Sequence, residues 1–431
     1  MSATPTSGVS RLVEAIVPGR LGPDFRWLWS GFAASNLADG ILLAAGPLLV
    51  TSISREPIAV ALAIFLQRLP WLLLGVVAGA IIDRTDRRRL IMAVNSGRAL
   101  VLASLAVAVA TDSLTLPFLY ATMFLIGIAE TFADNAGGTL VAVTVPSRVL
   151  GQANARLMGT RVVTNEFGGP PVGAFLFTFG MAVPFGVNAV LFALAVVLVS
   201  RIELTAGDIE RRGRRHLRGD VAEGVRWLWN HPPVRTLAML ITVFNITFGA
   251  AFSIWVLYAL ERLGLDERGF GLLMAASAVG GLTGSVVFTR LERRFAYATL
   301  LRAGLVIETL THLGLALTRS PVVAGAVMAL FGLHAATWGS VSTTIRMRAV
   351  PPALLGRVTS VYMIGSVGAF AIGTLIGGVL AQRFGIVSPF LFAFAGAAVT
   401  TALVWRSIPQ VAHAGEVDPD DHEVDLGQPV H

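Results

Sequence analysis

The chain lacks two residue types entirely, because none of its 431 residues is cysteine or lysine. Without cysteine it can form neither a disulfide nor a cysteine-ligated metal site, and it has no thiol nucleophile. Charged residues are also scarce, at 14% against about 25% in soluble domains. Hydrophobic residues make up 55% and are spread from end to end. A surface this apolar could not stay hydrated, so the composition predicts an integral membrane protein.

Two further absences narrow the class of function. The sequence has no nucleotide-binding loop of the P-loop type, so we expect no ATP-driven step. No spacing of histidine and carboxylate residues matches a metal site, and we expect no cofactor. The net charge is +7 and every one of the 33 basic residues is arginine. These arginines lie in short segments between apolar runs, which argues against a surface for nucleic acid.

Apolar segments of about 20 residues recur along the chain, the length that a helix needs to cross a hydrocarbon core about 30 Å thick. They predict an all-α integral membrane fold with twelve transmembrane helices. The expected spans are residues 25–50, 57–82, 90–110, 116–140, 160–179, 181–200, 234–260, 270–288, 297–317, 321–345, 358–382 and 387–405.

The arginines also predict how these helices are oriented. With the N-terminus inside, most arginines fall on the cytoplasmic side, including Arg87 to Arg89 after the second span. A basic linker after the sixth span adds Arg211, Arg212, Arg214, Arg215 and Arg218. Because cytoplasmic loops carry an excess of basic residues, we expect both termini in the cytoplasm and a multi-pass protein of the plasma membrane. Residues 219–230 of the linker predict an amphipathic helix on the inner surface.

The two halves of the chain can be aligned at one ungapped offset. The spacing from Gly79 to Gly284 equals that from Arg88 to Arg293, and the same shift places Val145-Pro146 on Val350-Pro351 and Phe179-Gly180 on Phe384-Gly385. Each repeat holds six spans that start on the same side, so the repeats are parallel and enclose a site near the midplane. We therefore expect a six-helix bundle (1–200), a cytoplasmic linker (201–231), a second bundle (232–408) and a disordered acidic tail (409–431).

A charged loop follows the second span. Its pattern consists of Gly79, Asp83, Arg84, Arg87 and Arg88. This pattern resembles the signature loop between helices 2 and 3 of the major facilitator superfamily, although Asp86 stands where a second glycine is usual. The resemblance implies two bundles that rock about a central site, in a fold that works as a monomer. We interpret Asp83 as part of a cytoplasmic gate, since its carboxylate would lie near the partially positive N-terminus of the eleventh span.

The fifth span contains Gly169, Pro170 and Gly173, a pattern similar to the helix 5 motif of facilitator-superfamily exporters. Ala174 replaces the final glycine of that motif. In physical terms, the glycines permit close helix packing and the proline softens the helix. The region from residue 130 to 173 also resembles bacterial exporters of drugs, macrolides and siderophores. The helix 4 arginine motif of many proton-driven drug exporters is absent.

Ionisable residues at membrane depth are candidate functional sites, because a charge within the bilayer is costly. Asp39 and Arg68 each lie about 14 residues, or about 21 Å at 1.5 Å per residue, from the cytoplasmic end of their spans. Equal depth on consecutive helices predicts an ion pair between them. Such a pair could hold the two helices together or take part in gating and proton movement.

Three carboxylates on the fourth and fifth spans are candidate proton carriers. Glu130 and Asp134 share a face of one helix, near the depth of Arg98 on the third span. Two carboxylates around one arginine would leave one of them inclined to bind a proton, or would form a buried structural network. Glu166 precedes the Gly-Pro turn, with no obvious arginine partner at its depth. Apolar surroundings should favour its protonated form, which makes Glu166 the main candidate for coupling.

Two histidines lie within the predicted spans of the second bundle. Glu308 and His312 are four residues apart on the ninth span and predict a hydrogen-bonded pair, and histidine titrates near neutral pH. Helices 3, 6, 9 and 12 are peripheral in the superfamily that the loop resembles, which favours a packing role for this pair. We expect His334, on the tenth span, to be a hydrogen-bonded interior residue.

Together these features predict a secondary transporter that exports a small amphipathic or hydrophobic molecule, by proton antiport with alternating access. Its expected partners are that molecule, protons and the lipid bilayer. An importer or lipid flippase of the same fold is the alternative, and the direction of substrate accumulation distinguishes them. No histidine cluster, Ser-Lys pair or Asp-rich motif supports a membrane enzyme. A non-transporting sensor is a more distant alternative, and would tolerate amides in place of all the carboxylates Asp39, Glu130, Asp134 and Glu166.

Overall fold

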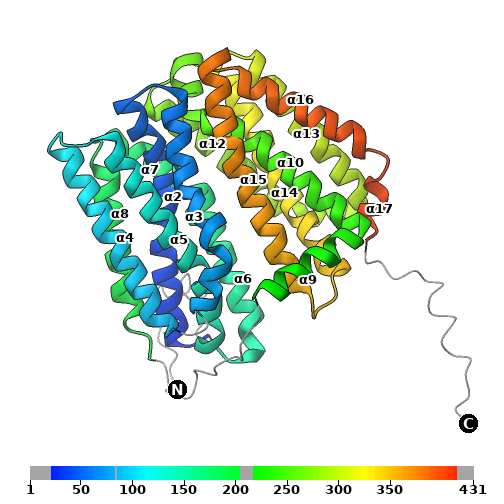
Figure 1. Cartoon of the computed structure of the whole chain (residues 1–431), viewed down its shortest axis with the longest axis horizontal. Helices are drawn as coiled ribbons and strands as arrows, with labels where there is room; N and C mark the ends of the chain where they lie inside the picture. The colour runs from blue at the N-terminus through cyan, green and yellow to red at the C-terminus, as the bar shows by residue number, and fades with distance from the viewer. Residues whose placement is uncertain (1–20, 83–84, 204–216, 415–431) are drawn as a thin grey trace, which may run out of the picture.

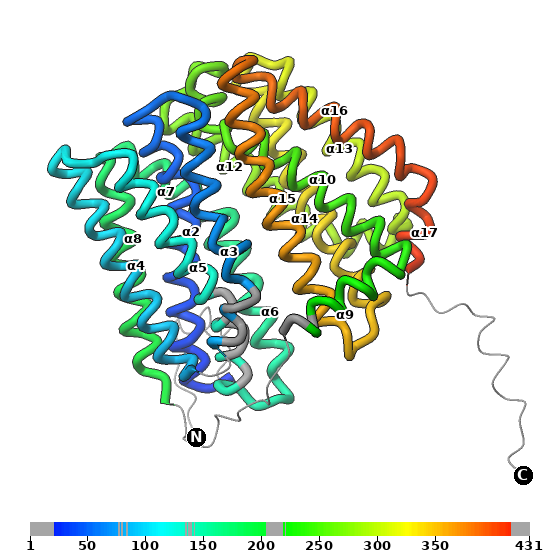
Figure 2. The backbone as a smooth tube through the Cα atoms, viewed as in Figure 1, coloured from blue at the N-terminus to red at the C-terminus, as the bar shows by residue number. Residues whose placement is uncertain are grey.

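The computed structural model describes residues 21–82, 85–203 and 217–414. These residues form helices joined by short turns, with no strand among them. Figures 1 and 2 show two helical bundles that stand side by side, with the linker helix α9 (Leu217–Asn230) crossing below the second.

The first bundle begins with four long helices and continues in a helical rod that changes its pitch. Its elements are α2 (Pro23–Ile53), α3 (Pro57–Ile82), α4 (Arg87–Ala110), α5 (Leu116–Thr144), η2 (Ser147–Val149), α6 (Leu150–Arg161), η3 (Val162–Gly168), α7 (Gly169–Phe177) and α8 (Val183–Val199). Asp86 begins α4, because its carboxylate accepts the backbone N–H of Arg89 at 3.1 Å. The η3 segment is π-helical and connects α6 to α7 without a break.

The second bundle has a similar order of elements. They are α10 (Pro232–Ser253), α11 (Trp255–Leu257), η4 (Tyr258–Arg262), α12 (Glu267–Arg294), α13 (Tyr297–Leu317), α14 (Pro321–Ala349), α15 (Leu355–Phe384), α16 (Ser388–Val404) and α17 (Ile408–Ala412). Asp266 caps α12 by accepting the N–H of Gly269 at 2.8 Å. Proline in the first turn of α10 and α14 replaces an N–H that would have no partner within the helix.

Nine helices of the described residues are long and apolar enough to cross a membrane. Two more apolar helices, α8 and α16, are shorter and coincide with the sixth and twelfth spans that the sequence predicts. The fifth predicted span, 160–179, is divided among α6, η3 and α7, since the π-helical turn interrupts the regular helix. The all-helical membrane fold is confirmed.

The two bundles touch along α3 with α15 and α7 with α12. Glycines make the approach possible, because a Cβ at Gly378 would stand 2.5 Å from Ala61, and one at Gly271 would stand 2.9 Å from Ala174. Figure 1 shows the bundles meeting near the end where α3 begins and α15 finishes. They diverge toward the end where α6 and α9 lie.

The glycines of the fifth span pack where the sequence predicts close helix contact. A Cβ on Gly169 would stand 2.5 Å from the backbone of Gly40 in α2, and one on Gly173 would collide with the carbonyl oxygen of Ile41. The second bundle repeats this arrangement, because Gly249 of α10 faces the carbonyl oxygen of Phe370 in α15. In each bundle a helix that lines the centre is fixed against its neighbour by backbone contact.

The structure corrects two expectations, one about the linker helix and one about the C-terminal tail. The linker helix α9 packs on α15, where Arg357 Nη1 lies 2.8 Å from Glu223 Oε2, so it is docked on protein as well as amphipathic. The prediction of a disordered tail from residue 409 is wrong for its first residues. Helix α17 buries Val411 and Ala412 against the second bundle, because apolar side chains there complete a core below α13. Residues 415–431 lie outside the described part.

Candidate functional site

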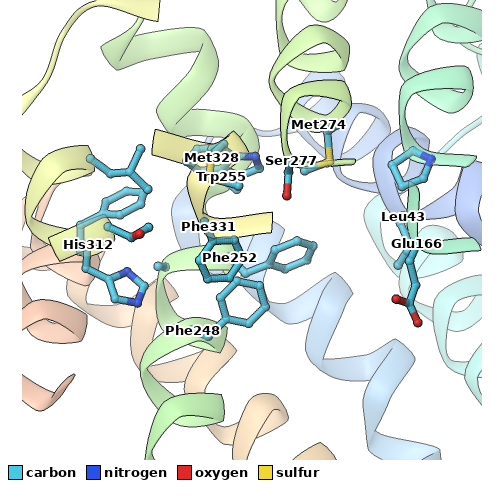
Figure 3. A pocket seen from close by; sticks show the side chains of 15 residues that line it. Leu43, Glu166, Phe248, Phe252, Trp255, Met274, Ser277, His312, Met328 and Phe331 are labelled. Carbon is cyan, nitrogen blue, oxygen red and sulfur yellow. The ribbon is translucent and has the colours of Figure 1, made fainter. Parts of the chain in front are cut away.

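A cavity of about 160 Å³ lies between the two bundles, lined by residues of both. Leu43, Glu166 and Pro170 come from α2, η3 and α7 of the first bundle. The second bundle supplies the opposite wall from α10 to α14 and from α16. Figure 3 shows Glu166 on one side and His312 on the other, with phenylalanine rings between them. A mostly apolar cavity with a few polar groups is the usual form of a small-molecule site.

Aromatic rings form the centre of the second bundle's wall. Phe248 and Phe331 stack with their ring centroids 5.4 Å apart, and Phe248 lies 5.6 Å from Phe252, one turn along α10. Phe370 of α15 joins the cluster at 5.9 Å from Phe248. Such rings offer flat apolar faces to a ligand. Sequence analysis missed this cluster, although the four-residue spacing along α10 places Phe248 and Phe252 on one helix face.

Glu166 is on the π-helical turn η3, and its side chain faces the cavity with 48% of its surface exposed. The nearest charge is the Nε of Arg161, at 4.0 Å from Glu166 Oε1. The expectation that Glu166 has no arginine partner is therefore wrong. The π-helical turn widens the helix here and brings an arginine from one turn earlier close to the carboxylate.

The predicted pair of Glu308 and His312 is confirmed, and a third residue joins it. Glu308 Oε1 lies 3.3 Å from His312 Nε2, and Glu308 Oε2 lies 3.2 Å from His334 Nε2 on α14. All three side chains are buried. His334 is thus a hydrogen-bonded interior histidine, as expected. However, His312 also lines the cavity, so its role is not limited to the packing that we expected for a peripheral helix.

A second cavity of about 190 Å³ adjoins the first and shares Leu43, Phe248 and Phe252 with it. Arg68 lines this cavity and its Nη1 lies 2.9 Å from Glu130 Oε1. Gln67 Nε2 lies 3.4 Å from the other oxygen of Glu130. The α3 and α5 helices are therefore joined by a partly buried ion pair at the edge of the central space.

Asp39 pairs with Arg98 at 3.3 Å, deep within the first bundle. The Arg98 side chain is only 1% exposed, and its guanidinium lies 5.0 Å from the centre of the Phe192 ring. The predicted pairs, Asp39 with Arg68 and Glu130 with Arg98, are therefore wrong. The reason is that α2 packs mainly on α7 and α8 and presents Asp39 to α4, while α3 faces α5. The side chain of Asp134 lies outside the described part.

Only part of the charged loop can be placed. Asp83 and Arg84 lie outside the described residues, and Gly79 is within α3 near its end. Arg88 donates hydrogen bonds to the carbonyl oxygens of Val199 and Ser200 at the end of α8. Arg87 starts α4. Arg88 thus ties the start of α4 to the end of α8, where helix carbonyls lack partners within the helix.

Two helical bundles, related by a sequence repeat and enclosing one shared cavity, define a membrane transporter of the major facilitator class. The chain belongs to the transmembrane secretion effector family of that superfamily, which matches residues 20–427. The signature-loop resemblance noted in the sequence is confirmed at the level of the superfamily.

Similar proteins include two named multidrug efflux pumps. The multidrug efflux pump Tap of Mycolicibacterium fortuitum is 25% identical over 384 residues, which cover 86% of this chain and 92% of the relative. The Tap pump of Mycobacterium tuberculosis is 26% identical over 411 residues, covering 90% and 94%. Macrolide efflux protein A of Streptococcus pyogenes is 21% identical over 391 residues, covering 85% and 91%.

Solved structures share the fold at low sequence identity. A bacterial homologue of the iron transporter ferroportin, in an inward-facing state, gives a TM-score of 0.67 at 17% identity and covers 90% of this chain and 98% of its own. The nucleoside transporter NupG gives 0.67 at 11% identity, covering 90% and 99%. This likeness concerns the fold alone. The family match and the apolar helices together identify the chain as a multi-pass transporter of the plasma membrane.

Proposed function

We propose that this protein exports a small amphipathic or hydrophobic molecule from the cytoplasm in exchange for protons. Its relatives are named multidrug and macrolide efflux pumps, and the alignments cover most of each chain. The cavity between the bundles has aromatic and aliphatic walls with a carboxylate at one side, which suits such a molecule. Because the sequence has no nucleotide-binding loop, an ion gradient is the energy source that this proposal requires.

The proposed topology has twelve spans and both termini in the cytoplasm. The nine long apolar helices would provide nine spans, α8 and α16 two more, and the rod of α6, η3 and α7 the twelfth. Each bundle would then be one repeat, with the linker between them on the cytoplasmic side. In this orientation the bundles meet at the outer end and diverge at the inner end (Figure 1), so this conformation would receive substrate from the cytoplasm.

The charged loop after α3 would act as the cytoplasmic gate when the bundles close. Arg88 already holds the start of α4 to the end of α8, which gives the loop a fixed base. In the closed state Asp83 would approach the N-terminal turn of α15, whose free N–H groups favour a carboxylate. The pairs of Asp39 with Arg98 and Arg68 with Glu130 would hold the first bundle rigid while it rocks.

Glu166 is the residue that we assign to proton coupling. One observation carries this assignment: its carboxylate is half exposed in a cavity that both bundles line, so it can meet water and substrate in turn. It stands on a π-helical turn, a deviation that is common at functional sites. In the outward-facing state, proton binding would remove its charge before the cavity turns inward, and proton release to the cytoplasm would restore the charge for the next molecule.

The test uses inverted membrane vesicles that contain the full chain. Uptake of radiolabelled erythromycin is measured with and without an imposed pH gradient, for the native chain and for Glu166→Gln. The matched control is Glu203→Gln, because Glu203 is an exposed carboxylate beyond α8 and outside the cavity. We expect gradient-driven uptake in the native chain and in Glu203→Gln, and its loss in Glu166→Gln.

The alternatives give different results in the same assay. Uptake that responds to the gradient equally in all three proteins would contradict the role of Glu166, while keeping proton antiport. Uptake that ignores the gradient would contradict proton coupling itself. Accumulation in whole cells in place of inverted vesicles would indicate an importer of the same fold.

A further inference from the structure

The buried cluster of Glu308, His312 and His334 fixes which nitrogen of each ring carries hydrogen. Both Nε2 atoms face the same carboxylate, at 3.3 and 3.2 Å. An ionised carboxylate accepts hydrogen bonds and donates none, so each neutral imidazole must carry its proton on Nε2. The Nδ1 atom of His312 is then left with a lone pair, which can accept a hydrogen bond.

The Nδ1 atom of His312 has no hydrogen-bond partner among the described residues, although it is fully buried. The whole side chain is only 2% exposed. Burying an acceptor without a donor is unfavourable, and native proteins rarely leave such an atom without a partner. An unmatched acceptor in a structure without ligands therefore marks a position where a donor from another molecule would be stabilised.

That acceptor belongs to a ring in the wall of the central cavity. His312 lines the cavity beside Thr311 and opposite Glu166, with Phe248 and Phe331 between the two sides (Figure 3). A molecule in the cavity would thus meet aromatic faces along its body and a hydrogen-bond acceptor at one edge. Apolar walls strengthen a hydrogen bond at that edge, because water does not compete for it.

We propose that His312 Nδ1 accepts a hydrogen bond from the transported molecule, and that the preferred substrates are aromatic molecules with an N–H or O–H donor. This inference rests on the proposed function, since it assumes that the cavity holds the transported molecule. His312 is a binding residue in this view. Glu308 is a positioning residue, because its carboxylate holds the ring with Nδ1 directed away from it.

The charged and titratable groups around His312 come from few elements. They are Glu308 on its own helix, His334 on α14, Tyr258 of η4, whose hydroxyl donates to the Leu315 carbonyl oxygen at 2.6 Å, and Glu166 across the cavity. Helices α16 and α17 contain no ionisable residue, and those of α12 lie at its two ends. The remaining charges of α14, Arg346 and Arg348, lie in its last turn. Glu308 is thus the carboxylate that contacts the ring directly.

Two dyes of similar shape separate the hydrogen bond from every other contact. Rhodamine 6G carries two N–H groups on its aromatic core, whereas tetramethylrhodamine ethyl ester carries none. Their dissociation constants are measured by fluorescence anisotropy with the purified full chain in detergent, at pH 8. The ratio of the two constants is the readout, because a general change in the cavity would weaken both dyes, while loss of the acceptor weakens only rhodamine 6G.

We expect the native chain at pH 8 to bind rhodamine 6G about tenfold more tightly than the dye without N–H groups, the size of one buried hydrogen bond. This preference should be absent in His312→Phe. His312→Gln, which keeps a carbonyl acceptor, should retain part of it.

His334→Phe is the matched control. It removes one hydrogen bond from Glu308, as His312→Phe does, but the His334 ring is not part of the cavity wall. This variant should keep the native preference between the dyes. Gel filtration and the melting temperature establish that the variants are folded, and His312→Gln serves as the test if His312→Phe is not.

Two results would overturn the inference. One is an unchanged preference between the dyes in His312→Phe, which includes equal weakening of both, and the other is failure of rhodamine 6G to bind the native chain. The assay contains no gradient, so its result is independent of proton-driven transport. Gradient-driven efflux with no preference between the dyes would contradict the role of His312 and leave the proposed function intact.

Discussion

The contact between Gly40 and the turn that carries Glu166 gives a sharp prediction. A Cβ at position 40 would stand 2.6 Å from the carbonyl oxygen of Asn165 and 2.7 Å from that of Thr164. Carbon and oxygen atoms normally approach to about 3.3 Å. Both obstacles are backbone atoms that cannot rotate away, so Gly40→Ala must push η3 from α2 by several tenths of an ångström.

The size of the effect follows from two opposing contributions. Overpacking of this kind costs about 1–3 kcal/mol. Alanine gains about 0.5–1 kcal/mol over glycine inside a helix. The net expectation is a loss of about 1–2 kcal/mol of unfolding free energy, together with a displaced Glu166. Gly97→Ala on α4 is the control, since a Cβ there meets nothing within 4 Å and only the helix gain remains.

Thermal unfolding of the purified protein, followed by tryptophan fluorescence, measures the first effect, and uptake into inverted vesicles measures the second. We expect Gly40→Ala to lower the melting temperature and gradient-driven uptake, and Gly97→Ala to raise the melting temperature slightly with normal uptake. Identical behaviour of the two variants would refute the argument that backbone contact at Gly40 positions Glu166.

Two further predictions concern interactions that only the structure reveals. In a double-mutant cycle of unfolding, Arg68→Ala and Glu130→Ala should show a coupling energy of about 1–2 kcal/mol. This is less than the about 3–5 kcal/mol expected for a fully buried pair, because both side chains are partly exposed. Strictly additive losses of unfolding free energy would contradict the ion pair. Burial lowers the pKa of His231 below its usual 6.5, and its neutral Nδ1 accepts the N–H of Val234 at the start of α10. The stabilisation that neutral His231 gives to the folded state should be complete above pH 6.5, and it should be lost as the pH falls through the lowered pKa. The melting temperature of His231→Asn should therefore fall less between pH 8 and pH 5 than that of the native chain, and an equal fall would exclude this role.

The sequence by itself determined the features that depend on local composition. Apolar runs of membrane length predicted the helices, because every backbone group in a bilayer must be hydrogen-bonded within its own segment. The glycines around Gly173 predicted close packing, since only the absence of a side chain permits such contact. The pairing of Glu308 with His312 was predictable because residues one turn apart on a helix always share a face.

Tertiary structure decided the contacts between helices. Equal depth suggested that Asp39 meets Arg68, but α2 packs mainly on helices other than α3, and Asp39 meets Arg98 instead. The addition of His334 to the Glu308 pair, and the position of His312 in the cavity wall, depend likewise on how α13 and α14 are rotated. Periodicity fixes which residues share a helix face, whereas the direction of that face is set by side-chain packing across the whole bundle.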